Sequence, residues 1–598
     1  MKITMTETPR YLITTADERT WKFDRPVLFL GEWCRIYDRR HVWEKMDAIV
    51  AAPYGLGQAK KDADHARARV LEAKLFPELC SVLNEVHGTA HGERYWRIVL
   101  GHWFRRYVNV VLNRVNTLEQ CLSNYLITST NVFDNTHYVL SPTNSYEAIW
   151  AFNDDSWNNI LNARIIELMG ESHLIQKRIN DEKDQGFTWK QSAPRSSLKR
   201  KVLVWGRERF GWLSQRFVRN SDAFIINSYL PKKEEMELQV ALGQFPQVWK
   251  SQVADLNASV NHTLRTNMKR KIIESTTADR LENIARALVF KLLPVCYLEG
   301  FKELNDQVNL LPWPRKPQFI FTSNNFDTDE TFKVWVAKMV VEGSKYIVGQ
   351  HGNNYGTHRF MNPSIEESTA DKFLTWGWTD DLPEHTPAFN FKVANLAQKK
   401  YDPLGGLLLI ELCLFHRIST WDGTSEFVEY FKDQLTLADK LASGARQTLT
   451  IRLHSEFRSH RWSEISRWKA LDPSLNIDTG ERNIRDLIAQ SRLVVHSYDS
   501  SGIFETLAQN IPTMAFWQNG FEHLRDSAKP YYQLLVDAGI VHLSAESLAR
   551  KVNEVWDDVD GWWLKESVQQ PRKTFCERYA RFSKNPVRDL KKILMDSV

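Results

Sequence analysis

Residues 497–512 (SYDSSGIFETLAQNIP) combine small polar side chains with the start of a predicted helix. They follow a short apolar run, so Ser500, Ser501 and Gly502 stand at the boundary between a strand and a helix. A helix N-terminus presents unpaired N–H groups and a partial positive charge, and both attract phosphate. Glu505 lies one turn further along, within reach of a ribose hydroxyl pair. These four residues predict a donor-binding site for a nucleotide; the alternative is a serine N-cap on an ordinary helix.

A second candidate lies in residues 450–460 (TIRLHSEFRSH). Arg452 and His454 end a predicted strand and, two positions apart, point to the same side. A buried charge at that place needs an anionic partner, and the guanidinium fork of Arg suits a phosphate or carboxylate. We therefore predict that Arg452 and His454 also bind the donor; the alternative is a basic cluster on the surface.

Residues 349–356 (GQHGNNYG) directly follow another apolar run. Gln350 and His351 are placed at the end of a strand, and the glycines allow close backbone approach to a ligand. His351 could act as a general base or as a donor to a leaving phosphate. Gln350 and His351 are therefore predicted as catalytic, and Gly352 and Asn353 as acceptor-binding. The alternative is a structural turn with a satisfied histidine.

Two carboxylates complete the predicted catalytic set. Glycosyl transfer needs a carboxylate or histidine base, or a carboxylate nucleophile, and Glu330 and Glu366 lie near His351 in the sequence. In residues 29–38 (FLGEWCRIYD), Gly31 and Glu32 follow the first predicted strand and are candidates for acceptor binding in an interdomain cleft. A well-packed aromatic turn is the alternative there.

Several common chemistries are missing from the sequence. It contains no GxGxxG after a strand, no GxxxxGK[ST], no HExxH and no GxSxG, which excludes the usual dehydrogenases, phosphate-loop NTPases, zincins and α/β-hydrolases. The six cysteines form no CxxC pair, so we expect reduced thiols and neither a disulfide framework nor a zinc site.

The bulk composition is that of an ordinary globular protein. The 598 residues are 43% hydrophobic and 25% charged, and 78 Lys+Arg against 73 Asp+Glu leave a net charge of +5. No long basic run occurs, which argues against a nucleic-acid binder. The small positive excess suits an anionic substrate or an anionic membrane surface, although an ordinary mixed surface explains it at least as well.

The N-terminal residues have no apolar core before a cleavage site, and no apolar run approaches the roughly 18 residues of a membrane span. We expect a cytoplasmic protein, with peripheral contact at the inner face of the cytoplasmic membrane as an open alternative.

The last third of the chain shows the clearest alternation of strands and helices. Such alternation predicts a parallel sheet covered on both faces, with ligands beyond the carboxyl ends of the strands. The strands expected there are residues 407–414, 449–453, 475–477, 493–496, 513–516 and 541–543. Earlier strands are expected at residues 27–31, 201–205, 223–227, 318–322, 345–349 and 372–376, among long helical stretches.

This pattern predicts four regions. They are an acceptor-side α/β domain with helical insertions (residues 1–385), a linker (386–405), a Rossmann-like donor domain (406–570) and a helical tail (571–598).

Several segments together resemble a known family. FLGEWC, GQHGNNYG, FLTWGW, IRLH and SYDSSGIFETLAQNIPTMAFW are similar to an uncharacterised family of transferases found in O-antigen and other surface-polysaccharide gene clusters, over nearly the whole chain. More distantly the chain is similar to bacterial Kdo-type transferases, which use CMP-activated acidic sugars and have a GT-B fold.

Two motifs match this wider group only in part. Glu505, Ala508 and Pro512 resemble the donor-nucleotide element of many GT-B enzymes, in which the Glu contacts ribose, but Asn510 replaces a common Gly. Kdo-type enzymes often bind the CMP phosphate through a His-Pro pair, whereas His454 is followed by Ser455. The resemblance therefore indicates the class better than the sugar.

The resemblance implies an α/β, GT-B-like fold in which two Rossmann-like domains face a cleft. It implies a glycosyltransferase that moves a sugar, Kdo-like or otherwise acidic, from a nucleotide-sugar donor, CMP-linked, to a glycan or lipid-linked glycan acceptor. The alternatives are a GT-B-shaped sugar-nucleotide epimerase, a polyol-phosphate transferase and a non-catalytic glycan-binding protein. No cofactor or metal is expected, because a helix dipole and basic groups can stabilise a leaving phosphate.

Overall fold

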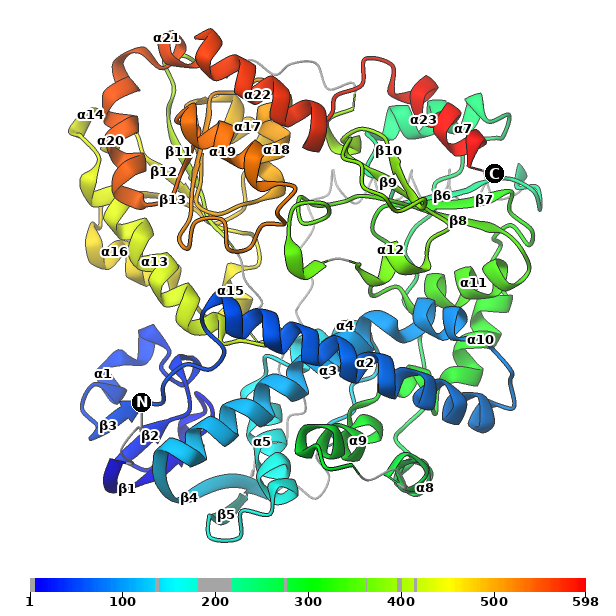
Figure 1. The fold of residues 1–598 in the computed structure, drawn as a ribbon, viewed down its shortest axis with the longest axis vertical. Coiled ribbons are helices and arrows are strands. Elements are labelled where there is room, and N and C mark those ends of the chain that lie inside the picture. The colour runs from blue at the N-terminus through cyan, green and yellow to red at the C-terminus, as the bar shows by residue number, and fades with distance from the viewer. Residues whose placement is uncertain are drawn as a thin grey trace, which may run out of the picture.

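The computed structural model describes residues 6–134, 139–180, 217–273, 277–361, 363–394, 401–412 and 417–597. They form three parallel β-sheets with helices packed around them (Figure 1). The predicted strand at residues 201–205 lies outside the described residues. The α/β class and the parallel sheets expected from the sequence are confirmed.

The first sheet has the strand order β3-β2-β1-β4-β5. Its strands are β1 (Thr6–Ile13), β2 (Val27–Phe29), β3 (Ala48–Val50), β4 (Tyr125–Asp134) and β5 (Ile175–Asn180). Only β2 was expected from the sequence. Strand β4 was missed because it continues without a break from a long helix and carries polar residues among its apolar ones (YLITSTNVFD).

The second sheet has the sequential order β10-β9-β8-β7-β6. Its strands are β6 (Phe224–Ile226), β7 (Phe319–Thr322), β8 (Lys345–Gly349), β9 (Lys372–Thr375) and β10 (His385–Pro387). The sequence indicated one α/β domain with helical insertions across residues 1–385, whereas the described residues of that stretch hold two separate sheets.

The third sheet has the order β13-β12-β11-β14-β15-β16, which is the Rossmann pattern 3-2-1-4-5-6. Its strands are β11 (Gly406–Ile410), β12 (Thr450–Arg452), β13 (Asn476–Asp478), β14 (Ser491–His496), β15 (Thr513–Phe516) and β16 (Val541–His542). Each predicted strand of this region is present, and the central ones are buried because helices cover both faces.

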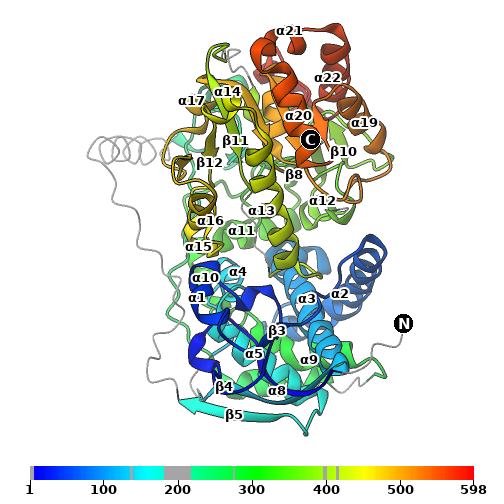
Figure 2. The same ribbon diagram turned by 90° about the vertical axis from the view of Figure 1, so that its left-hand side faces the viewer.

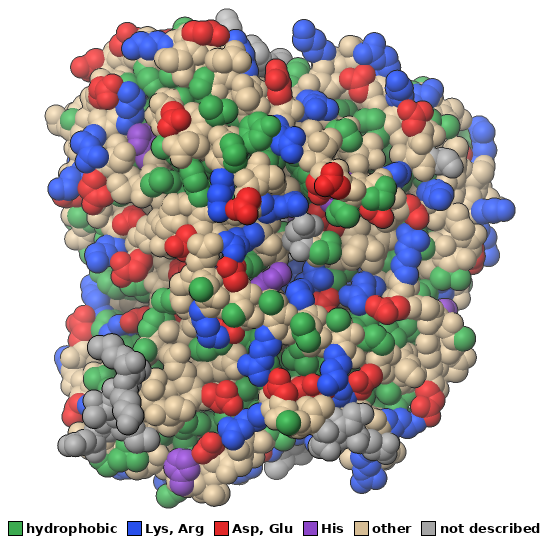
Figure 3. Space-filling model, in the orientation of Figure 1, with side chains coloured by type: hydrophobic (Ala, Val, Ile, Leu, Met, Phe, Trp, Pro, Cys, Tyr) green, Lys and Arg blue, Asp and Glu red, His purple; other side chains and the backbone are tan. Residues whose placement is uncertain are grey.

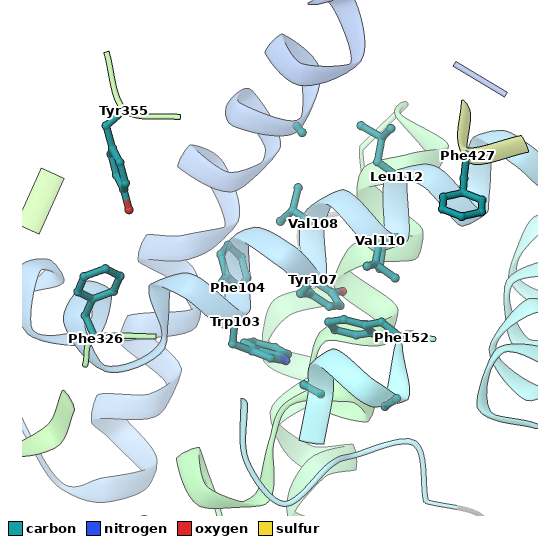
Figure 4. Packing of buried hydrophobic residues seen from close by; sticks show 14 of the residues in the cluster. Trp103, Phe104, Tyr107, Val108, Val110, Leu112, Phe152, Phe326, Tyr355 and Phe427 are labelled. Carbon is teal, nitrogen blue, oxygen red and sulfur yellow. The ribbon is translucent and has the colours of Figure 1, made fainter. Parts of the chain in front are cut away.

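Helix α3 (Glu93–Asn124) lies between the first sheet and the other two (Figures 1 and 2). Its 32 residues span about 48 Å at about 1.5 Å per residue. Figure 4 shows Trp103 and Tyr107 of this helix in one apolar cluster with Phe326 and Tyr355 from loops of the second sheet, and with Phe427 of α13 (Gly423–Lys440). A helix buried on so many sides is a core element, so α3 forms a core shared by the three sheets.

The predicted linker is partly built into the second sheet. Strand β10 and the short turn η7 (Phe391–Val393) lie within or beside residues 386–405, and Phe389 and Phe391 are fully buried. Apolar side chains placed between the Pro and Asn residues explain why this segment packs where its composition indicated a linker. Residues 395–400 lie outside the described part of the chain.

The C-terminal tail joins the third sheet to the second. Helix α22 (Glu566–Tyr579) packs on α19 (Lys529–Asp537), whereas α23 (Pro586–Asp596) packs on α7 (Lys232–Ala241) (Figure 1). Leu590 and Leu594 share a buried cluster with Ile225 and Phe321 of the second sheet.

The face shown in Figure 3 carries interspersed acidic and basic side chains, as the small net charge leads one to expect. Among the described residues, no helix combines the length and apolar character needed to cross a bilayer.

Candidate functional site

The loop after β8 lies directly against the loop after β14. The backbone N–H of Asn353 donates to Oγ of Ser501 at 3.0 Å, and its side-chain amide donates to Asp499 at 3.1 Å. A Cβ atom built on Gly352 would lie 3.5 Å from the same Ser501 oxygen. Residues predicted for the acceptor side and for the donor side therefore meet, and we call this place the interdomain junction.

Asp499 is the polar centre of the junction. Its carboxylate accepts hydrogen bonds from Nε2 of His358 at 3.2 Å, from Nε2 of His523 at 3.0 Å and from the Tyr532 hydroxyl at 2.8 Å, besides the Asn353 amide. Burial alone would raise the pKa of Asp499, but the hydrogen bonds from the two histidines hold that pKa well below its ordinary value. Sequence reasoning missed all three of these partners, because they come from segments far apart in the chain.

The backbone also joins the two sides of the junction. The N–H of Arg525 donates to the carbonyl of Thr357 at 2.7 Å, and the N–H of Arg359 donates to the carbonyl of His523 at 3.0 Å. These bonds form an isolated antiparallel bridge between His358 and Leu524. The ligand-type atoms of His358, Asp499 and His523 lie close enough together to hold a metal ion, but hydrogen bonds already account for their arrangement.

Helix α18 (Ser501–Ala508) begins at the junction. Its N-cap residue, Ser500, is buried and makes no side-chain capping bond, so the first-turn amides lack a side-chain acceptor. A Cβ atom on Gly502 would lie 2.6 Å from Cε1 of His496. Close packing on this buried imidazole therefore already requires glycine at position 502, whether or not a ligand also approaches.

Glu505 faces the second sheet from one turn inside α18. Its carboxylate lies 3.4 Å from Nζ of Lys392, a residue of η7. That ammonium also lies over the rings of Tyr229 at 5.0 Å and Trp376 at 5.7 Å. Lys392 stands in the predicted linker, and nothing in the sequence marked it as part of a site.

His351 is held by a chain of hydrogen bonds. The Tyr355 hydroxyl lies 3.0 Å from Nδ1 of His351 and also donates to the Glu366 carboxylate. Tyr355 has one proton, so donation to Glu366 requires Nδ1–H of His351 to donate to the tyrosine oxygen. Nε2 of His351 then carries the lone pair, which is the tautomer that a general base needs.

The electrostatic surroundings keep His351 neutral. Burial, assisted by the nearby Lys392, lowers the pKa of His351 to about 4, and Asp327 opposes that shift. Burial raises the pKa of Glu366. When Nε2 takes up a proton, the imidazole becomes positively charged. Glu366, connected to it through Tyr355, can then stabilise that charge, as the carboxylate of a catalytic triad does.

Helix α3 contributes residues that lie next to the hydrogen-bonded group of His351, Tyr355 and Glu366. Arg106 pairs with Asp327 through two bonds of 2.6 Å, and the His102 ring stacks on Phe326 with centroids 5.3 Å apart. Nε2 of His102 lies 3.6 Å from Glu366. Sequence reasoning did not assign these α3 residues to the site, because the helix was interpreted as part of an insertion.

Gln350 is buried, and its side chain makes three hydrogen bonds within the protein. It donates to the carbonyl of Gly352 at 2.8 Å and accepts from the backbone N–H of Trp376 and the indole N–H of Trp378, both at 2.8 Å. The structure thus gives Gln350 the role of shaping the loop that carries His351.

Glu330 lies apart from this loop, at the first position of α11 (Glu330–Val341). It accepts from the backbone N–H of Ser145 at 2.9 Å and pairs with Lys333 at 3.0 Å. It lines a separate cavity of 290 Å³, and no described hydrogen bond links it to His351.

Arg452 and His454 make no described hydrogen bond to a residue of the junction, although the register places Arg452 two strands from His496 at the same edge of the sheet. Arg452 pairs with Asp478, its register partner on β13, and donates to the carbonyls of Gly480 and Arg482. The anionic partner expected for Arg452 is thus present within the protein, because the parallel register places Asp478 beside it. His454 is exposed to solvent.

The predicted acceptor residues divide between two places. Gly352 and Asn353 lie at the junction, whereas Gly31 and Glu32 follow β2 beside a pocket between the first and third sheets. Glu32 pairs with Arg35 at 2.5 Å. A Cβ atom on Gly31 would collide with the Trp33 ring, so the ring packs directly on this glycine.

Comparison with known proteins gives one match over nearly the whole chain. A family model described as LIC12162 family transferase matches residues 10–594. No curated protein matches the sequence.

Two solved structures resemble parts of the fold at low identity. A protein described as a UDP-N-acetylglucosamine 2-epimerase from Listeria monocytogenes has 10% identity, covers 63% of this chain and 95% of its own, and has a TM-score of 0.34. A variant of the wall teichoic acid polymerase TagF has 11% identity, covers 67% of this chain and 95% of its own, and has a TM-score of 0.30.

Proposed function

Because the chain belongs to the LIC12162 family of transferases, we propose that it transfers a sugar from a nucleotide-activated donor to a glycan or lipid-linked glycan acceptor. The observation that carries this proposal is the interdomain junction. There the uncapped start of α18, on a Rossmann-like sheet, meets the loop that holds His351. Rossmann-like sheets bind nucleotides beyond the carboxyl ends of their strands.

In this proposal the donor lies along α18. The amides of Ser501 and Gly502 and the positive end of the helix face its phosphate, and Glu505 accepts from the ribose hydroxyls. Lys392, which now pairs with Glu505, adds a positive charge from the opposite side. These groups stabilise a leaving nucleotide without a metal.

His351 serves as the general base on the acceptor hydroxyl. Its Nε2 takes the hydroxyl proton while the bond between the sugar and the leaving phosphate breaks. Tyr355 and Glu366 hold the imidazole in the required tautomer, and Gly352 and Asn353 line the acceptor side. The finer part of the proposal, a CMP-linked acidic sugar, rests on the sequence resemblance to Kdo-type enzymes.

The experiment is a transfer assay preceded by a panel of thermal shifts. CMP, UDP and GDP, with their sugars, are each added to the full-length protein in the presence of a chelator. A nucleotide at 100 times its Kd should stabilise the protein by about 2.7 kcal/mol. Product formation that needs both donor and acceptor supports the proposal, whereas conversion of the donor alone would indicate an epimerase.

The Glu505→Gln substitution tests the donor site. We expect nucleotide affinity to fall about tenfold, because a hydrogen bond to a charged group contributes roughly 1.5–3 kcal/mol. Calorimetric titration with the stabilising nucleotide measures the change. Glu566→Gln, at the exposed start of α22, is the control and should bind normally. Unchanged affinity in Glu505→Gln would remove this residue from the site.

A further inference from the structure

A pocket outside the junction lies between the first and third sheets. It is lined by Ala16 after β1, Glu32 after β2, Arg417 after β11, and His460 and Arg461 after β12. Both sheets have Rossmann-like strand order and present the carboxyl ends of their strands to this pocket. Its volume is 80 Å³, whereas one water needs about 10–15 Å³. The site is therefore placed where α/β proteins bind ligands.

Arg417 is the main charge in the pocket wall. Its side chain is only 3% exposed, and its Nη2 atom has no hydrogen-bond partner among the described residues. Among the described residues the nearest carboxylate, that of Asp155, is 3.9 Å from Nη1, too far for a hydrogen bond. Leaving a buried guanidinium nitrogen unpaired is unfavourable, so this fork is suited to an oxyanion that the described residues do not supply.

The backbone around Arg417 is fixed in place. Arg114 of α3 donates to the carbonyl of Arg417 at 3.0 Å and to the carbonyl of Phe152 at 3.1 Å. The Arg417 guanidinium also lies over the Trp33 ring at 5.1 Å. The position of the unpaired nitrogen is thus set before any ligand arrives, which is what preorganised binding requires.

The charge balance of the pocket is positive. Besides Arg417, three arginines line it, against the two carboxylates of Glu32 and Asp155. Glu32 forms an ion pair with Arg35, and Asp155 forms an ion pair of 2.6 Å with Arg461. Arg417 therefore has only the Asp155 carboxylate at 3.9 Å, and no ion pair within 4 Å is described for Arg467.

Aromatic rings form the rest of the wall. Trp33, Tyr37, Trp150 and Trp462 all line the pocket. Flat rings next to an anion-binding fork suit a ligand with an apolar C–H face and one negative group. A sugar that carries a carboxylate or a phosphate has this combination, although Arg417 covers one face of Trp33, Arg467 lies over Tyr37 and Phe427 stacks on Trp462.

We propose that this pocket binds the anionic group of an acidic or phosphorylated saccharide, with Arg417 as the principal contact. The proposal deepens the proposed function, on which it rests for the identification of this saccharide as the acceptor. Binding of the saccharide itself needs no nucleotide, so it is tested independently of transfer.

The test is ligand-observed NMR and calorimetry on the full-length protein with three probes. They are glucuronic acid, glucose 6-phosphate and neutral glucose, each at millimolar concentration. We expect at least one of the two anionic sugars to bind at a single site and glucose to show no binding. The two charged probes separate a carboxylate ligand from a phosphate ligand. Binding of none of them, or equal binding of glucose, would overturn the proposal.

Substitutions locate the binding. Arg417→Gln should weaken the binding of the anionic probe about tenfold or more. Arg446→Gln, which removes an arginine that pairs with Asp472 outside the pocket, should bind as the wild type does. An unchanged Kd in folded Arg417→Gln would overturn the assignment.

A second variant keeps the test decisive if Arg417→Gln does not fold. Asp155→Asn removes a negative charge that faces Arg417 and Arg461 and preserves the shape of the side chain. It should tighten binding about threefold, an effect opposite in sign to that of a general loss of structure. Weaker binding in Asp155→Asn, or displacement of the sugar by CMP in the wild type, would contradict a saccharide site. If the wild-type protein binds the probe but transfers no sugar, the result counts against the proposed function alone.

Discussion

Replacing His351 by alanine is expected to lower turnover by about 10²–10⁴-fold while nucleotide affinity stays within about twofold. The substitution removes the imidazole that the hydrogen bonds from Tyr355 and Glu366 hold in the basic tautomer. The donor groups on α18 do not contact this imidazole in the described structure. Single-turnover rates and calorimetric nucleotide binding, measured on one protein batch, separate the two quantities.

Two further variants sharpen this prediction. His262→Ala removes an exposed histidine at the start of α8 (His262–Ile273) and should leave turnover unchanged. Tyr355→Phe keeps His351 but removes its orienting partner, so an intermediate loss of about 10–100-fold is expected. Full activity in His351→Ala would exclude the histidine from the chemistry.

The pH profile tests the same residue in the unmodified protein. Because the pKa of His351 is lowered to about 4, the imidazole stays neutral well below the ordinary histidine value of about 6.5. The base is active only when neutral, so kcat/KM should fall on the acid side near pH 4. If kcat/KM instead falls to half near pH 6.5, the environment described here for His351 is contradicted.

Replacing Asp499 by alanine is expected to lower the free energy of unfolding by roughly 3–5 kcal/mol. The substitution leaves the N–H groups of His358 and His523 and the Tyr532 hydroxyl without their shared acceptor at a buried place. It also weakens the contact between the second and third sheets. Urea unfolding followed by tryptophan fluorescence measures the effect. Asp526→Ala removes an almost fully exposed carboxylate nearby and should change stability by less than about 0.5 kcal/mol.

The pH dependence of this difference has a definite sign. The folded-state pKa of Asp499 is lowered, so its stabilisation is fully present above the unfolded value of 3.8 and is lost as the pH falls towards the folded pKa. Wild type and Asp499→Ala should therefore converge in acid and differ at neutral pH. A constant difference from pH 7 to pH 3 would contradict the assignment of an ionised Asp499.

Local patterns in the sequence were sufficient for the third sheet. Its strands are short apolar runs separated by helices, and such alternation admits few arrangements. The same reasoning placed His351 and Ser501 at the ends of strands, and the structure brings their loops together. What local pattern could not show is pairing between distant segments.

Three particular residues illustrate this limit. Asp499 stood inside a motif chosen for its serines, but its partners His358 and His523 become visible only when the loops of two sheets pack together. Arg452 was expected to await an anionic ligand, whereas the strand register supplies Asp478. The first sheet was missed because β1 and β4 are separated by more than a hundred residues of largely helical chain.

The central claim is that the activated donor binds at the interdomain junction. A crystal structure of the protein with bound CMP tests it most directly. We predict the phosphate within hydrogen-bond distance of the amides of Ser501 and Gly502, with the ribose beside Glu505. CMP bound elsewhere, for example in the pocket that Arg417 lines, with the start of α18 closed off by the loop of Asn353, would contradict it.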